Sequence, residues 1–159
     1  MTKTRWLDER EARAWRGYRR MRALLDLQLA RDLARDSGLS DADYDVLSDL
    51  SETLGHRLRL IDLAHQMLWS KSRLSHHLSR MERRGLVRRE EDPATSRGIV
   101  VALTATGLRT IRSAAPDHVE SVRRNLIDLL TVKQLDALGD AAERVVRHLN
   151  AVDGTPDAE

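Results

Sequence analysis

The sequence of 159 residues contains no cysteine and few aromatic residues. Without cysteine, the protein has no disulfides, no thiol redox sensor, no sulfur ligands for zinc and no cysteine nucleophile. The aromatic content of 3% disfavours single-strand binders that stack bases on aromatic side chains. No apolar run approaches the roughly 18 residues of a membrane-spanning helix, and no secretory signal opens the chain. We therefore expect a cytoplasmic protein that has no membrane partner.

Sequence motifs of enzymes are also missing. The chain has no Gly-x-Ser-x-Gly nucleophile motif, no phosphate-binding loop, no dinucleotide-binding glycine motif and no His-Glu-x-x-His zinc helix. Two acidic pairs, Asp43 with Asp45 and Glu90 with Glu91, are explained better as charges at a helix start and in a hairpin than as catalytic carboxylates. The sequence therefore predicts a protein that is not an enzyme and needs no cofactor.

Basic and acidic residues nearly balance, but they are unevenly distributed along the chain. Lys and Arg number 27 against 25 Asp and Glu, which gives a net charge of +2. Residues 57–97 hold ten basic and five acidic side chains, a net charge of +5, and the rest of the chain has a net charge of −3. A basic middle between acidic flanks predicts a localised surface that binds a polyanion.

The apolar spacing predicts a mainly helical protein. Asp8 with Glu11 resembles a capping box, and Gly38 is placed to end the helix that begins there. At ~1.5 Å per residue this helix is roughly 40 Å long. So small a chain cannot cover a helix of that length, and we expect a partner subunit to cover part of it.

Three shorter helices and a β-hairpin follow. Ser40 is placed to cap a second helix, residues 57–60 to form an extended link, and residues 61–67 to form a third helix. Ser70 should cap a fourth helix that ends at Gly85. The hairpin strands are predicted at residues 86–90 and 99–103, with a polar loop at 92–98 between them. A short helix, a tight turn, a basic helix and a hairpin, in that order, are typical of a winged helix-turn-helix.

The fourth helix carries the candidate contacts to DNA. Leu74, Leu78 and Met81 define its buried face, so the opposite face is expected to enter a major groove. Between Trp69 and Arg89 there are seven basic residues and one acidic residue, whereas a merely solvated face usually mixes both signs. The candidate residues of this helix are Ser70, Lys71, Ser72, Arg73, His76, His77 and Arg80. The candidates in the wing and along the DNA backbone are Arg84, Arg88, Arg89, Ser96 and Arg97.

Several stretches resemble the MarR family of bacterial transcription regulators. The matching stretches are Leu63-Ala64, Ser75 to Val87, and Asp92 to Gly107, which includes the Leu-Thr-x-x-Gly start of the next helix. The resemblance implies six helices and a two-stranded wing over nearly the whole chain. It also implies a homodimer on a pseudopalindromic operator, with half-sites about one helical turn apart.

The resemblance divides the chain into four segments. Thr104 should cap a fifth helix that Pro116 kinks or restarts, and Thr131 with Gln134 should cap a sixth helix that ends near Asn150. The expected segments are an N-terminal dimerisation helix (5–38), a winged helix-turn-helix domain (39–104), C-terminal dimerisation helices (105–150) and a disordered tail (151–159).

The wing departs from the family pattern at one position. The family usually has Asp-x-Arg at the wing tip, and this chain has Thr95-Ser96-Arg97. The resemblance implies that Arg97 enters a minor groove, where a narrow width concentrates negative potential. Without the usual acid, either Arg97 is freer before DNA binds, or Asp92 holds it instead.

Regulation is expected from a small ligand. The resemblance implies a pocket between the dimer helices and the DNA-binding domain, with Trp15, Tyr18, Tyr44 and His65 as candidate lining residues, although such residues are more often simply core. No metal site is predicted, since adjacent His76 and His77 do not converge as helical ligands would. His118 near Glu120 leaves a zinc-responsive regulator as an alternative.

The sequence thus predicts a sequence-specific repressor that binds double-stranded DNA as a homodimer and is released by a small-molecule effector. A sequence-tolerant architectural DNA binder is the competing class, and it would show a small ratio of specific to non-specific affinity. A dimer that binds another protein through its long helices would show no salt-dependent DNA binding.

Overall fold

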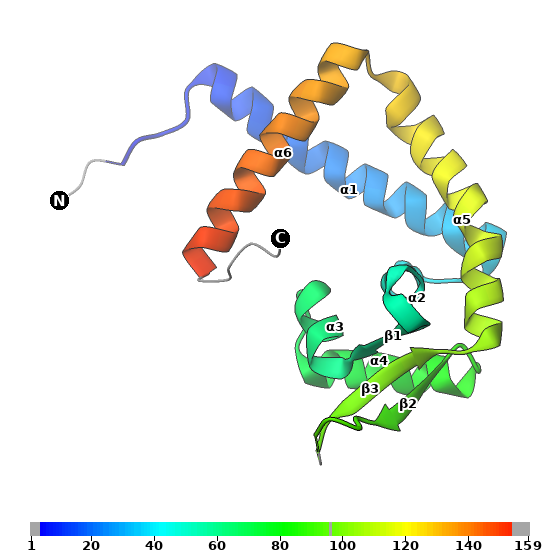
Figure 1. Ribbon diagram of the computed structural model, residues 1–159. Helices are drawn as coiled ribbons and strands as arrows, with labels where there is room; N and C mark the ends of the chain where they lie inside the picture. The colour runs from blue at the N-terminus through cyan, green and yellow to red at the C-terminus, as the bar shows by residue number, and fades with distance from the viewer. Residues whose placement is uncertain (1–3, 96, 154–159) are drawn as a thin grey trace. The chain divides into compact units, whose positions relative to one another are not determined.

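The computed structural model describes residues 4–95 and 97–153 (Figure 1). The chain forms two compact units, residues 1–120 and 121–159. The first unit contains α1 (Glu9–Ser37), α2 (Asp41–Glu52), a 3₁₀ turn (Leu54–His56), β1 (Arg57–Arg59), α3 (Leu60–Gln66), α4 (Lys71–Arg83), β2 (Val87–Glu91), β3 (Ile99–Leu103) and the first part of α5 (Ala105–Asn125). The second unit contains the end of α5, a 3₁₀ turn (Ile127–Leu129) and α6 (Val132–Asp153). None of the helices in the described part of the chain is long and apolar enough to cross a membrane.

The helix starts follow the capping residues that the sequence predicts. Asp8 and Glu11 form the expected capping box, in which each carboxylate accepts a hydrogen bond from the backbone N–H of the other residue. Gly38 ends α1 with a φ of 69°, a left-handed conformation that favours glycine. Thr131 and Gln134 cap α6, which continues past the predicted end to Asp153. The remainder of the predicted tail, 154–159, lies outside the described residues.

The predicted extended link at residues 57–60 contains a third strand. β1 pairs antiparallel with β3, with Leu58 opposite Val101, and β2 pairs with the other edge of β3. The sheet therefore has the order β1-β3-β2, where the sequence predicts the two-stranded hairpin alone. With the sequence Arg-Leu-Arg, β1 is too short to show an alternating pattern, and it becomes a strand because β3 offers it an edge.

Helix α5 continues through Pro116, so of the two outcomes that the sequence allows, a kink or a restart, the restart is wrong. A proline removes one backbone donor from a helix, but the turns on either side keep their own hydrogen bonds. Pro116 is exposed, so its ring does not disturb the packing of the buried face.

The core lies where α2, α3 and α4 meet the sheet. Its buried residues include the three that the sequence predicts for the inner face of α4, Leu74, Leu78 and Met81. Fully buried partners from α2 and α3 are Leu47, Leu50 and Leu63. Because the inner face of α4 is committed to this core, the opposite face is turned outward.

A buried carboxylate joins the start of α2 to α4. Asp43 Oδ2 accepts hydrogen bonds from Arg84 Nη1 at 2.6 Å and from the Ser40 N–H at 3.1 Å. Asp43 Oδ1 lies 3.1 Å from Nε2 of His77. Burial acts to raise the pKa of Asp43, but the hydrogen bonds from Arg84 and Ser40 outweigh it and hold the pKa below the usual 3.8. The carboxylate is therefore charged at neutral pH and stabilises the contact between the two helices.

The turn from β3 into α5 needs a glycine. The Thr104 hydroxyl caps the helix by accepting from the Gly107 N–H at 2.9 Å, and it donates to the carbonyl oxygen of Leu86 at 3.0 Å. These bonds hold Gly107 against the backbone before β2. A Cβ atom at position 107 would lie 2.0 Å from that same Leu86 oxygen.

We expect Gly107→Ala to lower the free energy of unfolding by about 3 kcal/mol, because backbone has to move to admit the new methyl group. Chemical denaturation measures the change. Gly17→Ala is the matched control, since a Cβ there meets no atom within 4 Å and lies inside a helix. This control should be neutral or stabilising by up to about 1 kcal/mol. Equal effects of the two variants would contradict the close approach at residue 86.

We expect Asp43→Asn to lower the free energy of unfolding at neutral pH by about 3 kcal/mol, because it leaves His77 and Arg84 without their anion. Asp41→Asn is the control, since Asp41 lies in the same helical turn but is exposed, and it should cost less than about 1 kcal/mol. The pKa of Asp43 is lowered by folding, so its stabilisation is present above pH 3.8 and is lost as the pH falls further. The difference between wild type and Asp43→Asn should therefore shrink below pH 3.8, and a constant difference would contradict the charged contact.

Candidate nucleic-acid interface

The outer face of α4 is basic and exposed. Ser70 caps the helix by accepting a hydrogen bond from the Arg73 N–H at 3.2 Å, as the sequence predicts. Six of the seven candidate residues of this helix are exposed, and we call the five that follow the Ser70 cap the basic face of α4: Lys71, Ser72, Arg73, His76 and Arg80. None of them is acidic. All but Lys71 border a surface hollow of about 760 Å³, which is also lined by Trp69, Ser70 and His77 and, from the start of α2, by Ser40 and Ala42.

His77, which the sequence predicts as a DNA contact, is buried and so does not share the exposure of the basic face. Its exposed fraction is 5%, and its Nε2 faces Asp43. The residue lies three positions after Leu74 and four before Met81, so helical geometry places it on the buried side. Burial of this polar ring costs less free energy because Nε2 faces the Asp43 carboxylate, which takes the place of the water that the atom loses on folding.

The two arginines of the basic face are each held by a neighbouring side chain. The guanidinium of Arg73 lies 3.8 Å above the centre of the Trp69 ring, within cation–π distance. Arg80 donates from Nη2 to His77 Nδ1 at 2.8 Å and from Nη1 to His76 Nδ1 at 3.2 Å. Sequence reasoning did not assign Trp69 a role. The available signal was its spacing, four residues before Arg73 across the start of the helix.

Arg89, expected at the DNA backbone, instead ties β2 to α4. It donates two hydrogen bonds to the Glu82 carboxylate, at 2.9 and 2.6 Å, and others to the hydroxyls of Ser75 and Ser79. The Arg89 guanidinium lowers the pKa of Glu82. We call these four side chains the wing clamp. Within the wing clamp, Glu82, Ser75 and Ser79 bind the Arg89 guanidinium, a cation that the sequence pattern assigns to DNA contact.

Two other arginines that are expected to contact the DNA backbone also have acidic partners. Arg84 is bound to Asp43 and leaves only part of its side chain exposed. Arg88 pairs with Glu90, which also accepts from Arg57, and the Arg88 guanidinium lowers the pKa of Glu90. These arginines therefore contribute less positive surface than their number in the sequence suggests.

The wing tip is organised by Asp92 and Thr95. Asp92 is buried and accepts from the Ala94 N–H at 2.9 Å and from the Thr95 hydroxyl at 3.3 Å. Asp92 therefore serves the turn, and the described residues show no ion pair between it and Arg97. Of the two possibilities that the sequence leaves open, this geometry favours the freer Arg97. Ser96, another candidate contact, lies outside the described residues.

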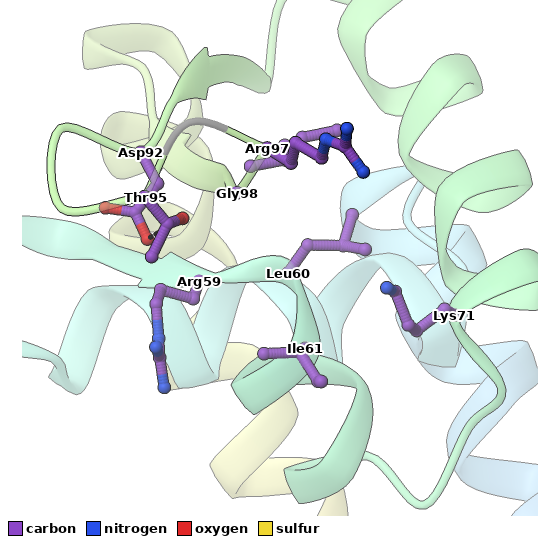
Figure 2. A pocket seen from close by; sticks show the side chains of 9 residues that line it. Arg59, Leu60, Ile61, Lys71, Asp92, Thr95, Arg97 and Gly98 are labelled. Atoms are coloured by element: carbon purple, nitrogen blue, oxygen red, sulfur yellow. Dashed lines mark hydrogen bonds between the residues drawn. The ribbon is translucent and has the colours of Figure 1, made fainter.

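A hollow of about 310 Å³ separates the wing tip from the start of α4 (Figure 2). The guanidinium of Arg97 points away from Asp92 and Thr95, on the same side of the hollow as Lys71 (Figure 2). Leu60, Ile61 and Ile99 supply apolar lining, and Arg59, which also borders the hollow, is paired with Asp62. The arrangement can attract an anionic group between the wing and the basic face of α4.

The four residues expected to line a ligand pocket are not brought together. Trp15 and Tyr18 stack on each other along α1 with ring centres 5.9 Å apart and are about half exposed, and His65 is exposed on α3. Tyr44 borders a hollow of about 270 Å³, where its ring centre lies 4.2 Å from that of His118. Three aspartates and two leucines complete its lining: Asp26, Asp41, Asp45, Leu29 and Leu33. Burial raises the pKa of Asp41 and of Asp45.

Potential metal ligands are scattered. Within residues 4–95 and 97–153, no three His, Asp or Glu side chains come together in a way that could hold a metal ion. His118, raised by the sequence as a zinc candidate, contacts the Tyr44 ring. The zinc-responsive alternative thus gains no support from the geometry.

Comparison with known proteins identifies the chain's relatives. The family model described as MarR family matches residues 37–98, which run from the end of α1 to the wing tip. The transcriptional regulator HosA of Escherichia coli O111:H- is 33% identical over 101 residues, which cover 64% of this chain and 73% of HosA.

Two solved structures resemble the whole chain. AbsC, a MarR family transcriptional regulator from Streptomyces coelicolor, is 45% identical with a TM-score of 0.89, and the match covers 93% of this chain and 99% of AbsC. Sco3205, a MarR family regulator from the same organism in complex with DNA, is 38% identical with a TM-score of 0.88, over 94% of this chain and 93% of Sco3205. On these matches, the chain belongs to the MarR family of transcriptional regulators.

Proposed function

We propose that this protein is a homodimeric repressor that binds a pseudopalindromic site in double-stranded DNA and is released by a small-molecule effector. The observation that carries the proposal is the basic face of α4, where Lys71, Arg73 and Arg80 project with no acidic residue among them. The relative Sco3205 was crystallised in complex with DNA. Such a repressor acts in the cytoplasm, beside the chromosome, and needs neither catalysis nor a cofactor.

The side chains of α4 divide into two roles. Arg73 and Arg80 have the length and donor geometry to bind guanine edges in a major groove, and His76 can contact a base or a phosphate. Ser70, Ser72 and the free N–H groups of the first turn suit a phosphate, because the positive end of the helix dipole lies there. Arg73 is already stacked on Trp69, so it loses little side-chain freedom when it binds.

The wing extends the same surface. Arg97 is the candidate for a minor groove, and its guanidinium lies on the same side of the hollow as Lys71 at the start of α4. A DNA backbone strand that passes along this side of the hollow would meet both cations. In this arrangement Arg84, Arg88 and Arg89 act mainly through their intramolecular pairs, and they add only a weak long-range attraction for phosphate.

Dimerisation is supported by apolar side chains that the single chain leaves exposed. Monomers rarely expose long apolar stripes, so a second copy is the fitting cover for those on α1 and α6. We assign residues 5–38 and 105–150 to the dimer interface and residues 39–104 to DNA binding. The exposed apolar residues on α1 are Trp15, Tyr18, Met21, Leu24 and Leu27, and those on α6 are Val132, Leu138, Val145, Val146, Leu149 and Val152.

The effector site is assigned to the hollow beside Tyr44. This hollow borders α1, α2 and α5, so a ligand in it would contact both the proposed dimer helices and the first helix of the DNA-binding region. A ligand that binds better to one arrangement of these helices would shift the population toward that arrangement.

We expect Arg73→Ala to weaken binding to the preferred duplex by about 1–3 kcal/mol and to relax selectivity at one base pair of each half-site. The duplex is first selected from a random pool by the wild-type protein, and affinities are then measured by fluorescence anisotropy. Arg109→Ala is the matched control, since it removes an exposed arginine of α5 outside the basic face and should change affinity by less than about threefold.

Full affinity and selectivity in a folded, dimeric Arg73→Ala protein would contradict the proposed readout. The selected duplex also separates the competing classes. An architectural DNA binder would lose little affinity when the duplex is replaced by an unrelated one, and a purely protein-binding dimer would show no salt-dependent binding to any duplex.

We expect Leu149→Asp to raise the dissociation constant of the dimer at least about tenfold, because it places a charge in an apolar interface. Leu149 is 53% exposed in the single chain. Arg147→Asp, on the opposite side of the same helix, is the control and should leave dimerisation within about threefold. Sedimentation velocity at several concentrations measures both. A wild-type protein that sediments as a monomer at all concentrations would contradict the proposed homodimer.

A further inference from the structure

His77 is a buried residue whose two ring nitrogens face different partners. Nε2 lies 3.1 Å from Oδ1 of Asp43, on α2, and Nδ1 lies 2.8 Å from Nη2 of Arg80, on the basic face of α4. Its ring also meets the edge of the Trp69 ring, with centres 5.6 Å apart and planes at 87°. His77 therefore contacts the buried Asp43 carboxylate on one side. On the other side it contacts Arg80 and the Trp69 ring, over which Arg73 lies.

These contacts determine where the proton lies on the ring. A guanidinium has only donors and stays protonated, so the His77 nitrogen that faces Arg80 must be the acceptor. The proton of the neutral ring is then on Nε2, where it faces the Asp43 carboxylate. A second proton on Nδ1 would point at Arg80 and remove its acceptor. The arrangement thus requires the neutral tautomer.

The charges around His77 act in opposite directions. Burial lowers the pKa of His77 below the usual 6.5, Asp43 acts to raise it, and the positive charges of Arg80 and Arg84 act to lower it. The outcome is a lowered pKa, so the ring is neutral at physiological pH. It gains its second proton only in acid.

Both arginines of the basic face rest on this residue. Arg80 is bound to His77 directly, and Arg73 lies over Trp69, whose ring packs on His77. His76 also accepts from Arg80, but it is exposed and can turn away, whereas the buried ring of His77 is fixed by the core. The fixed acceptor is the one able to set the direction of Arg80.

We propose that His77 is a positioning residue for DNA readout, which holds Arg80 directly and Arg73 through Trp69 without touching DNA itself. The inference rests on the proposed function, since it concerns how the DNA-binding arginines are aimed. It predicts that the Nδ1 acceptor matters for selectivity and that the Nε2 donor matters for stability. These two properties can be separated by two substitutions.

The test compares His77→Asn with His77→Gln in the full-length protein. The asparagine oxygen occupies the place of Nδ1 and keeps the acceptor for Arg80, whereas the glutamine amide reaches the place of Nε2 and keeps the donor for Asp43. Binding is measured on the duplex that the wild-type protein selects and on versions of it with single base-pair changes. Thermal unfolding of each variant is recorded beside the binding data.

We expect His77→Gln to lose roughly tenfold or more of its discrimination at the base pair read by Arg80, while its stability stays close to the wild-type value. His77→Asn should keep discrimination within about threefold even if it is less stable. The inference is overturned if discrimination is unchanged in His77→Gln, or if both variants lose it in proportion to their loss of stability.

A pH series supplies a second readout. Discrimination by the wild-type protein should hold through neutral pH and fall in acid as His77 gains a proton, while that of His77→Asn should change less over the same range. His76 is present in both proteins, so its contribution cancels in the comparison. Parallel pH profiles would overturn the inference. Failure of the wild-type protein to select any duplex would instead overturn the proposed function.

Discussion

The carboxylate of Asp43 is the contact on which the outward face of α4 depends. An anion removed from water needs polar partners: Asp43 accepts hydrogen bonds at the start of its own helix and near the end of α4, and His77 Nε2 lies 3.1 Å from it in the middle of α4. The apolar residues of α4 alone would tolerate a small rotation or slide, because hydrophobic contacts have little directionality. Two polar contacts from α4 to a single carboxylate do not tolerate such a rotation or slide. The outward direction of Arg73 and Arg80 is thus set on the buried side of the helix.

The helices were predictable from sequence because their signals are local. Capping residues such as Asp8 and Thr104 and the spacing of Leu74, Leu78 and Met81 act within a few residues of the elements they define. β1 was not predictable in this way, since its three residues become a strand only by pairing with residues 100–102. The spacing of His77 indicated burial, but its polarity argued for exposure, and only Asp43, far away in the sequence, decides between them.

The basic segment is less positive at the surface than its composition suggests. Ten basic side chains lie in residues 57–97. Arg84, Arg88 and Arg89 are paired with carboxylates in the same unit, and Arg59 pairs with Asp62. Composition pointed to a basic segment that the fold places in α3, α4 and the wing, but it could not separate arginines that hold the domain together from those that face solvent. That separation depends on tertiary contacts with Asp43, Glu82 and Glu90.

The wing clamp restricts how the domain can respond to a signal. Arg89 on β2 binds side chains from three positions along α4, so the strand and the helix cannot turn independently without breaking several charge-assisted hydrogen bonds. Helix α4 and the β2–β3 hairpin therefore move together as one rigid unit. In the proposed homodimer, what remains adjustable is the span between the two copies of this unit. A change of only a few ångströms in that span would take both out of step with the helical repeat of DNA, while each kept its own shape.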